Sequence, residues 1–294
     1  YRNGATDIDS GNEIPTGELS KIDQIWLEGS GDLVLQEDIQ VSTLLRIAST
    51  GNVDNNSNST SVLLPSGSTI ELEDTGGVSD AIDEDSDDYT VIVRADSTIN
   101  TGSDTHFAGT NYSLIVDNEA AGGITATLSA AATFVNVDVG EDDVIDLDGN
   151  DITVEGNLTA ETAGFFATGK SETITFGGSS MQELSLAGNW TVEDGDIIVF
   201  DNSAGFDLTD GNIDNSANDE DIRLTTGVVM TGADNYIFLN HQSSSDQGFD
   251  RTNGHVLGNV RKSLDAADST GSTERIIFPV GGNNVDLLTG NTED

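Results

Sequence analysis

The residues best suited to chemistry form an acidic run with the sequence DEDSDD at Asp83–Asp88. Asp83, Asp85, Asp87 and Asp88 would place several carboxylate oxygens close together, and oxygen atoms are the ligands that Ca²⁺ prefers. The run lacks the glycine at loop position six and the later glutamate that an EF-hand loop uses. We predict a solvated acidic loop here, with these four aspartates as candidate calcium ligands in the alternative.

A second stretch follows the calcium-loop pattern only in part. Asp146, Asp148, Gly149 and Glu155 fall at loop positions three, five, six and twelve, but Val144 occupies position one, where a calcium loop needs an oxygen ligand. The apolar residues between these acids alternate as they would in a strand that buries one face. We therefore predict a strand and a turn here.

Catalytic signatures are sparse. The three histidines show no HxH or HxxxH spacing, cysteine is absent, and Gly-x-Ser-x-Gly does not occur. Adjacent carboxylates such as Asp142 and Asp143 are the kind of pair that carbohydrate-cleaving enzymes use. With 53 acidic residues in the chain, however, such pairs arise by chance. We expect no enzymatic activity and no cofactor other than Ca²⁺.

The charge of the chain excludes two classes of partner. The 294 residues include 53 acidic and only 10 basic ones, for a net charge of −43. So few cations cannot neutralise nucleic-acid phosphates or form a polybasic membrane-docking face. No stretch approaches the ~20 apolar residues that cross a bilayer, so we expect no membrane insertion. The acidity fits a solvated surface in a salty medium, with cation binding or a basic partner as alternatives.

The elements that must position these residues are short alternating strands that end in turns. Ile152–Val154 is followed by Gly156-Asn157, and Leu184–Leu186 by Gly188-Asn189. Alternation places the apolar side chains on one face, and glycine and asparagine both suit turns. Amphipathic helical periodicity is missing. The pattern predicts an all-β parallel β-helix (β-solenoid). It disfavours the alternative, a β-sandwich, because Asn-Gly hairpin signals are scarce and the order Gly-Asn recurs.

The same pattern divides the chain into three parts. We expect an irregular N-terminal segment at 1–19, a β-solenoid at 20–240, and a C-terminal cap with a tail at 241–294. The cap is predicted to contain closing strands at His255–Lys262 and Glu274–Val280. The region around these strands is also the least acidic in the chain.

Several stretches resemble a known family: Ile145–Thr159, Thr173–Leu186, Gly227–Asn240, Gly254–Lys262 and Ile276–Gly282. They are similar to the rungs and closing block of the repetitive, secreted, adhesin-like cell-surface proteins of Bacteroidetes-type bacteria. The resemblance implies a right-handed parallel β-helix located outside the cell. It also implies cell-surface or matrix components as partners, through carbohydrate or through self-association into fibres.

Fold and resemblance together predict a non-catalytic structural or adhesive segment of a bacterial surface adhesin or filament. The alternative is a carbohydrate-binding or carbohydrate-active β-helix protein. A groove that collects acids, Trp190 and a basic residue would favour that alternative. Because the chain opens at Tyr1 without a signal peptide, we interpret it as a processed protein or a slice of a larger one.

Overall fold

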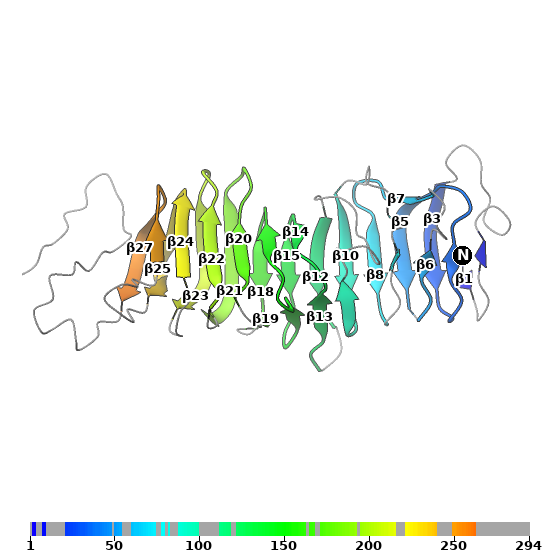
Figure 1. The fold of residues 1–294 in the computed structure, drawn as a ribbon, viewed down its shortest axis with the longest axis horizontal. Coiled ribbons are helices and arrows are strands. Elements are labelled where there is room, and N and C mark those ends of the chain that lie inside the picture. The colour runs from blue at the N-terminus through cyan, green and yellow to red at the C-terminus, as the bar shows by residue number, and fades with distance from the viewer. Residues whose placement is uncertain are drawn as a thin grey trace, which may run out of the picture.

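The computed structural model describes residues 2–3, 8–9, 21–48, 50–54, 60–74, 78–79, 82, 88–99, 112–118, 122–162, 165–167, 171–192, 195–215, 221–239 and 249–262. Within these ranges every regular element is a β-strand, and neighbouring strands in each sheet are parallel. The strands lie side by side along one long axis, in sequence order from one end to the other (Figure 1). The predicted β-solenoid is confirmed.

One long sheet of 13 strands runs along the molecule. Its strands are β1 (Arg2–Asn3), β3 (Lys21–Leu27), β5 (Ile39–Ile47), β7 (Val62–Leu63), β8 (Thr69–Leu72), β10 (Tyr89–Val93), β12 (Tyr112–Val116), β15 (Val137–Val139), β18 (Leu158–Ala160), β21 (Gln182–Thr191), β23 (Phe206–Asn215), β25 (Val228–Leu239) and β27 (His255–Lys262). Each strand pairs with the strand that the chain reaches after one further turn.

Three shorter sheets make the other sides of the solenoid. A six-stranded sheet contains β14 (Ala132–Phe134), β17 (Ile152–Val154), β20 (Thr173–Phe176), β22 (Ile197–Asp201), β24 (Asp221–Thr226) and β26 (Phe249–Arg251). A four-stranded sheet contains β11 (Ser97–Ile99), β13 (Thr125–Leu128), β16 (Val144–Asp146) and β19 (Phe166–Ala167). The other contains β2 (Ile8–Asp9), β4 (Leu33–Val34), β6 (Val53–Asp54) and β9 (Val78–Ser79).

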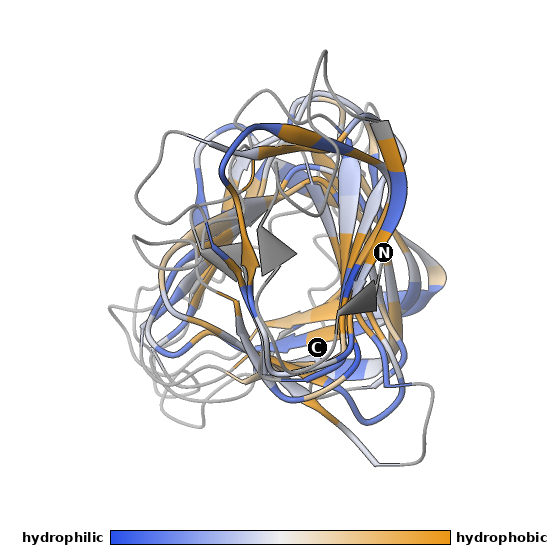
Figure 2. Cartoon of the chain, turned by 90° about the vertical axis from the view of Figure 1, so that its right-hand side faces the viewer, coloured by the Kyte–Doolittle hydropathy of each residue, from blue (hydrophilic) through white to orange (hydrophobic). Residues whose placement is uncertain are grey.

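The core lies inside the coil because alternate residues of each strand face the axis. In β17, Ile152 and Val154 are buried while Thr153 is partly exposed. Residues of the same kind stack in register on neighbouring rungs. Ile152 pairs with Ile174, and Phe176 pairs with Phe200, with their ring centres 5.5 Å apart. Viewed down the axis, the chain winds around a common centre (Figure 2). Each rung therefore buries its apolar residues mainly against its two neighbours.

The stretch that partly matches a calcium loop is a strand and a tight turn, as predicted. Asp148 and Gly149 have φ values of 45° and 84°, and the Asn150 amide donates to the Leu147 carbonyl at 2.8 Å. Two consecutive positive φ values are typical of a type I′ turn, in which Asp-Gly is favoured. Ile145 and Leu147 before it are fully buried. The Asp residues here therefore shape a corner of the solenoid.

One turn prediction was wrong. Gly188-Asn189 lies inside β21, where the pairing with β23 shifts register between Ser185 and Asn189. The backbone bends around this corner while its hydrogen bonding continues on both sides, as a bulge allows. Gly211, inside β23, has a φ of 71° and marks the same corner one turn later. In these turns the Gly-Asn pairs mark bulges within long strands.

Both ends of the chain contain strands that extend the sheets of the solenoid. Within 1–19, Arg2–Asn3 and Ile8–Asp9 form short strands that pair in parallel with β3 and β4, so the segment is not wholly irregular. At the other end, β27 covers the predicted closing strand and extends the long sheet in parallel. The second predicted closing strand, Glu274–Val280, lies outside the described residues.

An inward-facing column ends in a charge near the C-terminal end. Phe200 pairs with Leu224, and Leu224 pairs with Arg251 of β26. Arg251 is exposed, and its Nε donates to the Gly254 carbonyl at 2.8 Å. A charged residue at the end of an apolar column disfavours the stacking of another rung on it.

Candidate functional site

The predicted calcium ligands fall mostly outside the part of the chain that the structure describes. Asp83, Asp85 and Asp87 are not described. Asp88 is exposed, has a φ of 50° and comes directly before β10, with its carbonyl accepting from the Gly67 amide at 3.1 Å. Among the described residues, no group of three or more His, Cys, Asp or Glu side chains could hold a metal ion. The calcium site stays a prediction.

The carboxylate pair considered for catalysis is used in a turn. Asp143 is only 1% exposed, and its two oxygens accept the amides of Ile124 at 2.9 Å and Asn118 at 3.0 Å. Asp142 has a φ of 65° and forms part of the turn between β15 and β16. Because both oxygens of Asp143 are hydrogen-bonded to backbone amides of the preceding turn, this pair does not form an open acid pair.

Other acids and amides also bond to the adjacent rung. The Asn52 amide donates to Asp32 at 2.7 Å, and the Thr173 amide donates to Asp151 at 2.7 Å. A side-chain oxygen that accepts a backbone N–H satisfies a donor that the turn would otherwise leave unpaired. Part of the acidity of this chain therefore serves the corners of the solenoid.

A partly buried charge network crosses five strands of the long sheet. Arg94 reaches Glu71 with Nε at 3.1 Å and Asp117 with Nη1 at 3.2 Å. Arg46 approaches Glu71 at 3.6 Å and forms a hydrogen bond with Glu73. Its guanidinium also lies 5.0 Å from the centre of the Trp26 ring. These contacts tie β3, β5, β8, β10 and β12 together on the outer face. Charges in a network contribute more to stability than isolated surface pairs do.

At the edge of this network, Asp138 and Glu161 lie near Asp117, whose own carboxylate pairs with Arg94. Desolvation raises the pKa of Asp138 on β15, and the nearby carboxylates of Glu161 and Asp117 raise it further. Within the described ranges, no basic side chain forms an ion pair with Asp138 or Glu161. Like-charge repulsion on the outer surface is therefore concentrated at Asp138 and Glu161, which have no cation partner among the described residues.

Trp190 is not available as a sugar platform. It is only 4% exposed, and its ring centre lies 5.2 Å from that of Phe165, 5.8 Å from that of Phe166 and 6.1 Å from that of Phe176. Aromatic contacts of this kind stabilise a core beyond the area that they bury. The tryptophan named in the carbohydrate alternative thus belongs to the interior.

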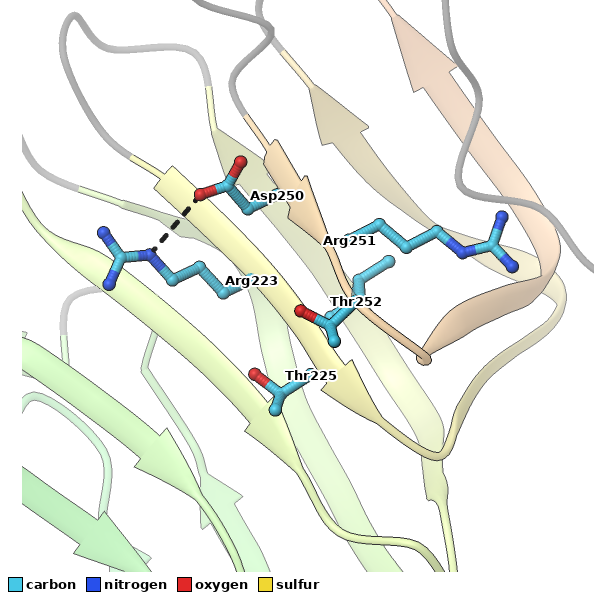
Figure 3. Close-up of a pocket in the computed structure, with 6 residues that line it drawn as sticks. Arg223, Thr225, Asp250, Arg251 and Thr252 are labelled. Carbon is cyan, nitrogen blue, oxygen red and sulfur yellow. Dashed lines mark ion pairs between the residues drawn. The ribbon is translucent and has the colours of Figure 1, made fainter.

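A shallow pocket of about 360 Å³ lies on the outside of β24 and β26 (Figure 3). It is lined by Arg223, Leu224, Thr225, Asp250, Arg251 and Thr252. Arg223 and Asp250 face one another in register, with Nε and Oδ2 separated by 4.0 Å. The hydroxyls of Thr225 and Thr252 lie on the same outer surface, whereas Arg251 points the other way (Figure 3). The pocket can offer a carboxylate, a guanidinium and two hydroxyl groups to a polar ligand.

Sequence reasoning missed this pocket because its members are far apart in the chain. Arg223 stands in a strand-like run, whereas Asp250 ends the polar stretch HQSSSDQGFD within the predicted C-terminal cap. The signal that could have found them is strand register, because residues that pair on neighbouring rungs share one face.

Comparison with protein-family models, curated proteins and solved structures gave no significant match. In the part of the chain that the structure describes, no helix is long and apolar enough to cross a membrane. The class of protein defined by the fold is therefore a parallel β-solenoid, and its function must be argued from its own residues.

Proposed function

We propose that this chain is a non-catalytic structural segment of an extracellular protein, a stiff spacer or adhesive stalk at a bacterial cell surface. The observation that carries the proposal is the long stack of parallel rungs with a dry core, which extends along the whole described chain (Figure 1). A stack of this kind resists bending because every rung is hydrogen-bonded to the next over a wide sheet.

Side chains reinforce the same axis. The Asn212 amide group donates to Asn189 Oδ1 at 2.7 Å, and Asn212 Oδ1 accepts the Tyr236 backbone amide at 2.8 Å. Asn136 and Asn157 make the same kind of contact, with the Asn157 backbone amide 2.9 Å from Asn136 Oδ1. Such bonds between turns, added to the ladders of the sheets, support a load-bearing role.

The location outside the cell and the kinship with adhesin-like surface proteins are supported by the sequence resemblance and by the charge. A net charge of −43 keeps copies apart at low ionic strength and is tolerated where salt screens it. Stability that depends on stacking and not on disulfides agrees with the absence of cysteine. Partners would be cell-surface or matrix components.

Small-angle X-ray scattering on the purified chain tests the proposal. We expect the profile of a rod, with a radius of gyration clearly above the about 19 Å of a compact domain of this length. A compact profile would refute the spacer role. Repeating the measurement and a thermal melt with Ca²⁺ and with chelator tests the Asp83–Asp88 run: bound calcium should raise the melting temperature, and an unchanged melt would remove that site.

A carbohydrate-binding role is the second candidate, and the pocket on β24 and β26 is the observation that favours it. Its two threonine hydroxyls and its Arg223–Asp250 pair suit a polar, hydroxyl-rich ligand. Titration with neutral and acidic oligosaccharides, observed by NMR, tests this role. Shifts that disappear in a Thr225→Val, Thr252→Val variant would support it, and no shifts would exclude it for the sugars used.

A further inference from the structure

The last two strands of the long sheet carry apolar and aromatic side chains on their outer surface. Met230 of β25 pairs with Leu257 of β27, and Phe238 of β25 pairs with Arg261 of β27. Leu257 is 49% exposed, and Met230, Tyr236 and Phe238 are each partly exposed. We call Met230, Tyr236, Phe238, Leu257 and Arg261 the terminal patch. Apolar and aromatic side chains gathered on an exposed face are typical of an interaction surface.

The patch begins abruptly at β25. The residues of β23 that pair with Met230 and Phe238 are Asp207 and Asp214, both acidic. Between β23 and β25 the outer face thus changes from acidic to apolar within a single rung. A gradual loss of charge would have fitted a simple solvated end, whereas this boundary marks out a separate surface.

Arg261 is the charged residue of the patch, and its setting differs from that of Arg46, Arg94 and Arg223. Its guanidinium lies 3.6 Å from the centre of the Tyr236 ring. Arg46, Arg94 and Arg223 each form an ion pair with a carboxylate, whereas within the described ranges Arg261 forms none. A guanidinium stacked on a ring keeps its N–H edge available for bidentate contact with a carboxylate. The residue is therefore set to receive an anionic group from outside.

The same chain displays a surface of the complementary kind. Asp117, Asp138 and Glu161 lie on or next to the long sheet several rungs earlier, and we call them the acidic corner. Asp138 and Glu161 are exposed, and neither has a basic partner among the described residues. A guanidinium that arrived here would relieve repulsion between like charges.

We propose that the terminal patch of one copy docks on the acidic corner of a second copy. The inference rests on the proposed structural role and names the partner as the chain itself. A second copy is favoured over an acidic polysaccharide because the complementary carboxylates are present on this molecule. The two surfaces differ, so the contact is heterologous, and repeated contacts of this type extend into a staggered filament.

Ionic strength provides the first test. Two copies with a charge of −43 each repel strongly at low salt. Near 0.15 M ionic strength the screening length falls to about 8 Å, so that contact charges dominate over distant ones. Very high salt then screens the local Arg261 pairs as well. Sedimentation velocity should therefore show association that peaks at intermediate salt. A wild-type chain that stays monomeric at every salt and concentration overturns the proposal.

Charge reversal provides the second test and locates the contact. Arg261→Glu places a negative charge against the corner, and Asp138→Arg places a positive charge against the patch. Each variant alone should associate about tenfold more weakly than the wild type. When the two are mixed, association should return, because each copy meets a complementary partner. A mixture that remains monomeric, or single variants that associate normally, would contradict the assigned surfaces.

Matched variants show whether a change in association comes from the terminal patch itself. Arg251→Glu makes the same charge change at the same end but outside the patch, and it should associate as the wild type does. Leu257→Ser removes an exposed apolar contact and should weaken association without affecting the fold. Circular dichroism checks that each variant is folded. Scattering separates the two proposals: a wild-type chain that is a rod but never associates keeps the spacer role and removes only the docking.

Soluble polygalacturonate serves as the competing partner. If wild-type chain stays monomeric and binds this polymer, and Arg261→Glu abolishes the binding, then the patch recognises an acidic polysaccharide and the self-docking proposal is wrong. If the polymer only competes with association, both ligands present carboxylates to the same arginine, and the proposal stands.

Discussion

Replacing Ile152 by aspartate tests which face of β17 points inward. Ile152 is 1% exposed and lies in a column with Ala132 and Ile174, its partners on the two neighbouring rungs. Its neighbour Thr153 is partly exposed and pairs with Thr133 and Thr175 on the outer face. The same substitution at these two adjacent positions therefore places one carboxylate in the core and the other in solvent.

The magnitude follows from two costs at position 152. Removing a fully buried isoleucine loses about 1.5–3 kcal/mol of apolar burial. An aspartate in the same dry column must either remain charged without a partner or take up a proton. Holding it neutral at pH 7, when its ordinary pKa is about 3.9, costs roughly 4 kcal/mol. The total approaches the whole stability of a typical domain, about 5–15 kcal/mol. For Thr153→Asp we expect less than about 1 kcal/mol.

Guanidinium denaturation followed by circular dichroism measures both variants, and hydrogen exchange shows where protection is lost. In Ile152→Asp, protection should fall first in β14, β17 and β20, since rungs depend on their nearest neighbours. The loss should shrink as the pH falls toward 4, because the carboxylate is then neutral in the unfolded chain as well. If the two variants were equally stable at pH 7, the inward assignment would be refuted.

Two further substitutions follow from local geometry. Alanine at Gly211 would place a methyl group 2.4 Å from the carbonyl oxygen of Gly188 at a φ of 71°, whereas alanine at Gly149 meets nothing within 4 Å at a φ of 84°. In denaturant titrations Gly149→Ala should cost about 1–2 kcal/mol, and Gly211→Ala clearly more. Asp138→Asn should stabilise the protein at neutral pH, since the folded state raises the pKa of Asp138 and so disfavours its charged form. That gain should vanish as the pH falls below the ordinary range of a carboxyl group, and a pH-independent gain would contradict this cause.

The sequence predicted which faces of the strands are buried more reliably than it predicted the corners between the strands. Alternation of Ile152, Thr153 and Val154 set the inward face, because side-chain direction in a strand depends only on position. The pair Gly188-Asn189 has the composition of a turn, yet it lies within β21. A local pattern cannot separate a turn from a bulge, because the difference lies in whether the flanking residues continue to pair with the next rung.

For the candidate sites too, the sequence showed the residues but not the partners that the fold brings to them. That Trp190 lies inside agrees with its alternation with Thr191 and Val192. Its contacts could not be predicted, because Phe165 and Phe166 come from an earlier rung and Phe176 lies on β20 in another sheet. The acid pair at Asp142 and Asp143 stands out in the sequence, but only the folded chain brings the amides that Asp143 accepts.

By itself the sequence determined that the chain is all-β, that it coils with a dry interior, and that its surface is strongly acidic. These properties follow from residue type and a period of two, which act locally. Only the tertiary structure decided which residues from different rungs share a face: Arg223 with Asp250, Phe238 with Arg261, and Asp138 with Glu161 and Asp117. The reason is that register depends on how many residues each turn contains, and turns of unequal length bring together residues that no fixed spacing predicts.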